Sequence, residues 1–279
     1  MNVNLLRTAA RSKAVLIGGI IVLAVVLAAI LAPLLSTHDP YEMNVKERLL
    51  DPLEGGHLLG TDQFGRDLYT RILYGAQVSL EVGIVSVSLA LVIGVTLGLI
   101  SGYYGGWIDT VIMRFVDIVL SFPVLLLAIA FVAALGPGIE NVTIALALVY
   151  WTSYARLVRA TVLSIKEEEY VQAARTIGSS DFRIIVYNIL PNCLAPIIVV
   201  ATLGLGQAIV AEATLSFLGL GIQPPESSWG WTLAFGMKFL QDAPHLSIYP
   251  GVAIMLTVLG FNLLGDGIRD LTDTKLKQK

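Results

Sequence analysis

The chain has 279 residues, of which 56% are hydrophobic and only 14% are charged, and its mean hydropathy is +0.77. Soluble globular domains carry about a quarter charged residues, so this composition excludes an ordinary soluble protein and indicates an integral membrane protein with several spans. The net charge of -3 excludes nucleic acid as an expected partner, because there is no excess of basic side chains to neutralise phosphates.

The first apolar run extends from Ala14 to Leu35, behind a tail that contains Arg7, Arg11 and Lys13. The hydrophobic region of a secretory signal peptide has about 7–15 residues. This run is longer, and at ~1.5 Å per residue it can cross ~30 Å of hydrocarbon. We therefore expect a membrane helix here.

Further apolar runs predict five more membrane helices, so we expect an all-α protein with six transmembrane helices. Residues 1–77 would hold the N-terminal tail, the first helix and an external loop, and residues 78–279 would form a five-helix core. The five predicted spans are Val78–Gly102, Val111–Leu135, Ile139–Tyr154, Leu190–Leu220 and Ile248–Ile268.

The distribution of the 18 basic residues predicts the orientation of these spans. Lys and Arg gather on the cytoplasmic side of membrane proteins. If the N-terminus is cytoplasmic, most of this chain's Lys and Arg residues fall on the cytoplasmic side of the predicted spans. We then expect both termini and the segment Glu167–Pro191 to be cytoplasmic, and Ser36–Gln77 and Ile222–Ser247 to be external.

The first external loop ends in a charged stretch. Opposite charges stand near helical spacing, which predicts a salt-bridged amphipathic segment at the membrane surface. The charged residues are Asp62, Arg66, Asp67 and Arg71.

The histidines and the cysteine carry no recognisable chemistry in the sequence. His38, His57 and His245 show no metal-ligand spacing, so we expect no metal site. Cys193 is the single cysteine and cannot form an intrachain disulfide.

Several charged residues fall within predicted spans, and three of them suggest a role. Arg114 and Asp117 are three residues apart and are expected to pair on one helix face. Glu212 is the acid deep inside a span. An ionisable group there is a functional hypothesis by default, and the alternative is a hydrogen bond between helices.

The second external loop carries aromatic residues at helical spacing. Trp231, Phe235 and Phe239 follow one another at intervals of four, and Trp229 stands just before them. Such a stripe suits anchoring at the membrane interface, and we expect that role rather than substrate stacking.

The segment Glu167–Pro191 is a polar stretch between two apolar spans, and we call it the elbow segment. Its apolar residues recur at helical spacing on both sides of Gly178-Ser179-Ser180, which predicts two short amphipathic helices joined at a break. Gly178 suits a left-handed position after the first helix, and Ser180 or Asp181 suits a cap for the second. Ala173 and Ala174 predict a low-relief face that a partner could approach closely.

The elbow segment resembles the cytoplasmic signature of permease subunits of bacterial ABC importers, which reads Glu-Ala-Ala, three residues, Gly, nine residues, Ile, one residue, Leu-Pro. Gln172 and Asn188 replace the Glu and the Ile of the signature. The residues in register are Ala173, Ala174, Gly178, Leu190 and Pro191.

Two further stretches are similar to the second permease of peptide, nickel and glutathione importers. One is the C-terminal stretch Phe261–Leu276. The other lies at the end of the first external loop and includes Gly60, Thr61, Asp62, Gly65, Arg66 and Asp67.

This resemblance implies a type I (MetI-like) permease in the cytoplasmic membrane of a bacterium. The elbow segment would belong to a cytoplasmic coupling loop, residues 156–190, and its signature positions from Gln172 to Pro191 would transmit motion from the ATPases. The implied partners are a homologous second permease, two ABC ATPase subunits, an extracytoplasmic solute-binding protein and membrane lipid. ATP and Mg²⁺ would be bound by the ATPases, so we expect no cofactor on this chain.

The absence of a nucleotide motif agrees with that expectation. No G-x-x-x-x-G-K-[ST] sequence and no catalytic motif occurs in the chain, so we do not expect it to be an enzyme. The alternative function is a stand-alone ion-coupled secondary transporter or channel that uses Glu212 and the pair of Arg114 and Asp117. Within the permease interpretation, the substrate stays open among di- and oligopeptides, nickel and glutathione.

Overall fold

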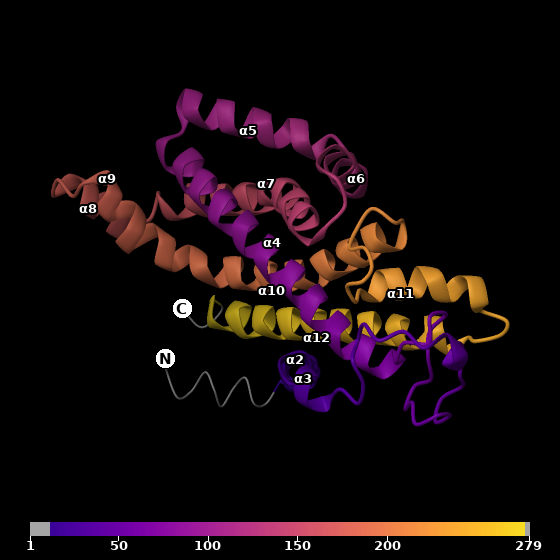
Figure 1. The fold of residues 1–279 in the computed structure, drawn as a ribbon. Coiled ribbons are helices and arrows are strands. Elements are labelled where there is room, and N and C mark those ends of the chain that lie inside the picture. Colours follow the sequence, from indigo (N-terminus) through magenta and orange to yellow (C-terminus); the bar gives the residue numbers. More distant parts are fainter. Residues whose placement is uncertain (1–11, 277–279) are drawn as a thin grey trace.

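Long helices form the body of the protein. The computed structural model describes residues 12–276, in which the regular structure is helical and no β-strand occurs, only one isolated bridge between Thr61 and Asp67. Leu68–Tyr104 (α4), Leu190–Phe217 (α10) and His245–Leu276 (α12) are the longest helices after the first loop. Figure 1 shows the loop that precedes α4 at one end of these helices and the elbow segment at the other.

The N-terminal helix packs along the C-terminal one. Lys13–Ile30 (α2) is followed by the short Ala32–Leu35 (α3), so the first predicted span is present with a break at Leu31. Gly18 of α2 allows the close contact, because a Cβ atom there would lie 2.6 Å from the backbone nitrogen of Leu264. Arg7, Arg11, Lys277 and Lys279, which contribute to the predicted orientation, lie outside the described residues.

The second predicted span begins earlier than expected. Asp67 caps α4 by accepting a hydrogen bond from the backbone of Thr70, so ten residues assigned to the external loop are helical. Ile139–Ile165 (α7) packs against α4 and also extends beyond its predicted end at Tyr154. The division of the chain at residue 77 stays a prediction, and α4 crosses it without a break.

Three glycines set the close packing of α4 on α7. Gly94, Gly98 and Gly102 recur every four residues, and a Cβ atom at each would lie 2.5–2.7 Å from the nearest atom of α7. Small residues at this spacing let two helix backbones approach closely in a membrane. The glycine stripe therefore determines which face of α4 contacts α7.

The third predicted span is not one straight helix. Gly106–Leu120 (α5) and Val124–Leu135 (α6) meet at an angle of 89°. Pro123 lies at the break, where it cannot supply a backbone donor to continue α5. The continuous apolar pattern conceals this bend.

The second half of the elbow segment also differs from the prediction. The first half forms Glu169–Thr176 (α8), but Asp181–Arg183 (α9) continues through a π-helical turn, Ile184–Ile189 (η2), directly into α10. Pro191 does not end the helix, because the hydrogen-bond pattern already shifts at the π-helical turn. The elbow segment is thus one short helix joined to the end of a long membrane helix.

Four helices of the described residues are long and apolar enough to span a membrane, and the bent pair α5 and α6 would make a fifth. These four are Lys13–Ile30, Leu68–Tyr104, Asp181–Phe217 and His245–Thr272. The fourth predicted span falls on α7, which does not meet that test. The count of six spans therefore stays a prediction.

The aromatic residues of the second predicted external loop are not a surface stripe. Trp229–Gly236 (α11) and Met237–Phe239 (η3) contain them, and Trp229 and Trp231 are buried. The indole nitrogen of Trp229 donates to the backbone oxygen of Ile72 in α4, 2.9 Å away. The prediction of simple interfacial anchoring is wrong for these two residues, because tertiary packing encloses them.

Candidate functional site

The elbow segment turns at Gly178, as predicted. Gly178 has φ +80°, its backbone nitrogen donates to Arg175 and that of Ser179 donates to Ala174, both over 3.0 Å. This pair of hydrogen bonds is the Schellman motif, in which the left-handed residue follows the last helical turn. Ser180 is at the cap position of the following helix, but its side chain makes no capping hydrogen bond.

The two alanines of the signature face different ways. Ala173 is exposed, whereas Ala174 packs with the fully buried Val171 and Ile184 in a cluster of the chain's own side chains. The expectation that both alanines form one outward face is therefore wrong. The outward surface consists instead of Ala173 and exposed large apolar side chains, namely Tyr170, Ile177, Phe182 and Tyr187.

Polar contacts attach the elbow segment to the end of α4. The hydroxyl of Tyr103 donates to Asp181 over 2.7 Å, and the guanidinium of Arg175 lies 5.0 Å from the centre of the Tyr103 ring. On the other side of the turn, Gln172 donates to the backbone oxygen of Lys166 over 2.9 Å. Leu190 packs in the same buried cluster as Ala174. The elbow segment thus contacts α4 and continues into α10.

The predicted pair of Arg114 and Asp117 does not form. Asp117 accepts a hydrogen bond from Arg156 of α7 over 2.6 Å, and both side chains are more than half exposed. A second ion pair joins the same helices, in which Arg159 of α7 donates twice to Asp109 of α5. Ion pairs between residues distant in the sequence thus join α5 to α7. An exposed pair such as Asp117 with Arg156 contributes only ~0–1 kcal/mol to the stability of the fold.

Glu212 is enclosed by serine hydroxyls. Ser79 of α4, Ser216 of α10 and Ser228 at the start of α11 donate to its two carboxylate oxygens over 2.9–3.0 Å. The Glu212 side chain is completely buried. It therefore joins three elements of the fold and has no surface with which to touch a passing solute in this conformation.

An apolar cavity of about 460 Å³ lies between α6, α7, α10 and α12. Its wall is formed mainly by aliphatic side chains and carries four polar ones, from Tyr150, Gln207, Thr214 and Asn262. A mostly apolar wall with a few hydrogen-bonding groups is typical of a site for a small molecule. This site was not among the sequence predictions, although Gln207 and Asn262 are polar residues within apolar runs and were a usable signal.

The motif at the end of the first loop is structural in this conformation. A Cβ atom at Gly60 would lie 2.3 Å from the backbone oxygen of Leu50, and one at Gly65 would lie 1.8 Å from that of Asn44. The hydroxyl of Thr61 accepts a hydrogen bond from the backbone nitrogen of Leu50. These residues let separate segments of the loop pass close to one another.

The charges of this motif are buried rather than spread on a surface. Asp62 accepts a hydrogen bond from Arg66 over 2.7 Å, within a turn and not on a helix, and both side chains are almost fully enclosed. The predicted salt bridge is present, but the amphipathic surface segment is not. Arg71 extends from α4 and donates to the backbone oxygens of Pro40 and Glu226, so it holds the two predicted external loops together.

Comparison with known proteins places these features in a family. Residues 94–278 match the family described as the binding-protein-dependent transport system inner membrane component, and residues 5–52 match the N-terminal transmembrane domain of oligopeptide transport permease C. A dipeptide transport system permease protein DppC of Alkalihalophilus pseudofirmus is 52% identical over 96% of this chain and 88% of its own length.

Other relatives carry related names. DppC of Haemophilus influenzae is 46% identical over 96% of this chain and 92% of its own length, and the glutathione transport system permease protein GsiD of Pectobacterium atrosepticum is 43% identical over 96% and 89%. A chain of the MetNI methionine ABC transporter, solved in inward-facing conformations, matches with a TM-score of 0.58 at 20% identity over 72% of this chain and 96% of that chain. This match to the MetNI chain shows that the two chains share a fold.

Proposed function

This chain belongs to the family of binding-protein-dependent transport system inner membrane components, and from that premise we propose that it passes peptides through the cytoplasmic membrane of a bacterium. It is a permease subunit of an ABC importer and has the fold of such permeases. The names of the relatives support a peptide substrate, since dipeptides and glutathione are both short peptides. The cavity between α6, α7, α10 and α12 supports the same substrate class, because apolar walls suit peptide side chains and its polar groups suit backbone amides.

The proposed path would be shared with a second permease. In the assembly we propose, this chain and a homologous permease enclose the path, two ATPase subunits bind on the cytoplasmic side, and an extracytoplasmic binding protein delivers the peptide. ATP and Mg²⁺ would be held by the ATPases, and this chain would supply a path and a gate without catalysis. The loop before α4 would face the binding protein, and both chain ends would be cytoplasmic.

The observation that carries this proposal is the exposed apolar face of the elbow segment. Tyr170, Ile177, Phe182 and Tyr187 are large apolar side chains that stay open to the surroundings on a short, otherwise polar segment. Exposed apolar patches bordered by polar residues mark interaction sites. Because Tyr103 joins this segment to α4, closure of the ATPases would move α4 and α10 as a unit and switch the path between its two openings.

A charge placed on this face tests the proposal. Ile177 is 82% exposed, so Ile177→Glu is expected to fold normally while it weakens docking of the ATPases, because the new carboxylate would be desolvated in the interface. Leu53→Glu is the matched control, since Leu53 is 79% exposed in the loop before α4. Both variants would be reconstituted with the partner subunits, and ATPase pull-down and peptide uptake would be measured.

We expect Ile177→Glu to lose most of the bound ATPase and of the uptake, and Leu53→Glu to keep the bound ATPase. Equal ATPase retention in the two variants, with wild-type uptake, would show that the elbow segment is an ordinary loop. The alternative of an ion-coupled transporter predicts uptake in liposomes that contain this chain without ATPases. Nothing in the geometry favours it, because Glu212 is enclosed and Arg114 does not pair with Asp117.

A further inference from the structure

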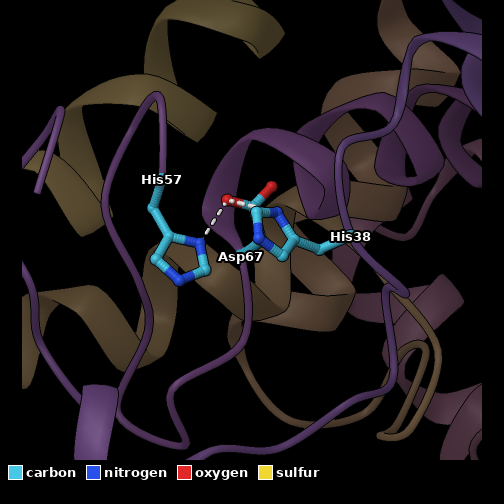
Figure 2. Close-up of side chains that lie close together, drawn as sticks. All are labelled: His38, His57 and Asp67. Carbon is cyan, nitrogen blue, oxygen red and sulfur yellow. Dashed lines mark hydrogen bonds and ion pairs between the residues drawn. The ribbon is translucent and has the colours of Figure 1, made fainter. Parts of the chain in front are cut away.

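Two histidines and an aspartate converge in the loop that precedes α4. His38 follows α3, His57 lies in the middle of the loop and Asp67 is the residue that caps α4, so three separate segments contribute one side chain each. Figure 2 shows both imidazole rings beside the Asp67 carboxylate. One potential ligand atom from each residue lies within 4.8 Å of the other two.

The distances suit a single metal ion. The Nδ1 atom of His57 lies 2.8 Å from Oδ1 of Asp67, and the Nδ1 atom of His38 lies 3.7 Å from the same oxygen. In a tetrahedral site with metal–ligand bonds of ~2.0–2.2 Å, neighbouring ligand atoms are about 3.3 Å apart. The two observed distances lie on either side of this value, so shifts of up to about half an ångström would accommodate an ion. The ion would take the place of the hydrogen bond between His57 and Asp67 and of the contact between Nδ1 of His38 and the hydroxyl of Thr37.

The surroundings orient the side chains for this task. The other oxygen of Asp67, Oδ2, accepts from the backbone nitrogen of Thr70 over 2.8 Å, which fixes the carboxylate. The other ring nitrogen of His57, Nε2, lies 3.7 Å from a carboxylate oxygen of Glu47. A metal-binding histidine usually donates its second nitrogen to such an acceptor, which sets the tautomer and the ring orientation. Glu47 is near enough to take this role if its carboxylate moves closer, since 3.7 Å is longer than a hydrogen bond.

The burial of the group leaves one side open. The side chains of His57 and Asp67 are 5% and 0% exposed, whereas that of His38 is 35% exposed. An ion held here would have protein ligands on its inner side and room for water or another ligand on the side of His38. Neutral imidazole and carboxylate ligands favour Zn²⁺ and its divalent transition-metal neighbours over Ca²⁺ or Mg²⁺, which take oxygen ligands.

We propose that His38, His57 and Asp67 form a site for one divalent transition-metal ion of the class of Zn²⁺. Because its ligands come from the chain after α3, from the middle of the loop and from the residue that caps α4, the bound ion clamps the loop onto the membrane helix. The open side permits a further ligand from outside the chain. This site is separate from the cavity and from the elbow segment, so it does not depend on the proposed peptide transport.

This proposed site departs from the expectation of no metal site, which rested on spacing along the chain. A local motif holds ligands on one helix or one turn, whereas His38, His57 and Asp67 meet only when the loop folds back on the start of α4. His245, the third histidine, is not part of the group; its Nδ1 atom lies 4.0 Å from Asp51.

The test is metal binding by the full chain, purified in detergent with any affinity tag removed and stripped with a chelator. Co²⁺ is titrated as a spectroscopic probe, and Zn²⁺ is then used to displace it. His38→Asn removes the exposed ligand while His57 and Asp67 keep their hydrogen bond, so we expect this variant to retain its fold. Glu47→Gln tests the orienting acceptor, and His245→Gln is the control that removes a histidine outside the group.

We expect one Co²⁺ ion per chain with visible absorption bands of a low-coordinate site, displaced by Zn²⁺. His38→Asn should lose the bands and bind at least ~10-fold more weakly, Glu47→Gln should weaken binding by up to ~10–100-fold, and His245→Gln should bind like the wild type. Zn²⁺ should also raise the melting temperature of the wild type but not of His38→Asn. Wild-type binding in His38→Asn, or absence of stoichiometric Co²⁺ binding by the folded wild type, would overturn the proposal and leave a histidine pair that only stabilises the loop.

Discussion

Replacement of Gly178 separates the geometry of the elbow segment from its surface. Gly178 has φ +80°, and a Cβ atom at this position would meet no other atom within 4 Å. A substitution therefore adds no clash, and the whole cost is the conformation of the backbone. Gly178→Val forces a β-branched residue into a left-handed conformation, whereas Gly178→Asn introduces a residue that tolerates this conformation.

The expected magnitude follows from that conformation. Left-handed backbone in a non-glycine residue costs about 1–3 kcal/mol, with valine at the upper end. If the elbow segment relaxes to avoid the strain, the Schellman hydrogen bonds from Gly178 and Ser179 are lost and α8 changes its direction relative to α9. An energy of this size shifts the population of the native elbow by roughly 5–150-fold.

The assay is peptide uptake and peptide-stimulated ATP hydrolysis in proteoliposomes that contain the full complex, together with an ATPase pull-down. We expect Gly178→Val to lose most of its uptake and its coupling to ATP hydrolysis, and Gly178→Asn to keep most of both. The membrane helices should be inserted normally in each variant, because the position has no packing neighbours. Equal uptake in the valine and asparagine variants would refute the reasoning, since it would show that the left-handed turn has no part in transport.

Three other predictions concern two side-chain contacts and the orientation in the membrane. Tyr103→Phe removes the hydrogen bond to the elbow segment but keeps the ring, so uptake should fall several-fold while the ATPases remain bound; unchanged uptake would mean that α4 does not follow the elbow. Glu212→Gln should keep uptake within a few-fold, because an amide still bonds to the three serines, and complete loss of uptake in an assembled complex would indicate a step that needs the charge. In a Cys193→Ala background, an impermeant thiol reagent added outside intact cells should label Gln241→Cys and not Ser180→Cys, and the reverse pattern would invert the proposed orientation.

Local patterns in the sequence predicted those features of the structure that depend on residues close together in the chain. The turn at Gly178 is confirmed, because a helix that ends at a glycine needs only adjacent backbone groups to form its hydrogen bonds. The apolar runs predicted the membrane class and the helical fold, since a spanning segment must satisfy its backbone hydrogen bonds internally. The family was also identified correctly from the stretches around Ala173 and Gly65.

Only the tertiary structure decided which distant groups meet. Asp117 pairs with Arg156 rather than with Arg114, because α7 brings a cation from another part of the chain closer than the helix itself does. The right angle between α5 and α6 is absent from a hydropathy pattern, which records how apolar a run is and not its direction.

The same limit applies to the polar residues that could bind a ligand or take part in function. Glu212 could be read from the sequence as an acid within a span, but its enclosure by three serines depends on the contact of α4, α10 and α11. His38, His57 and Asp67 show no ligand spacing along the chain and meet through the folding of a long loop. Sequence periodicity thus determined which segments are helical and apolar, whereas packing determined which polar side chains share a site, because a site is formed by distances in space that chain spacing does not encode.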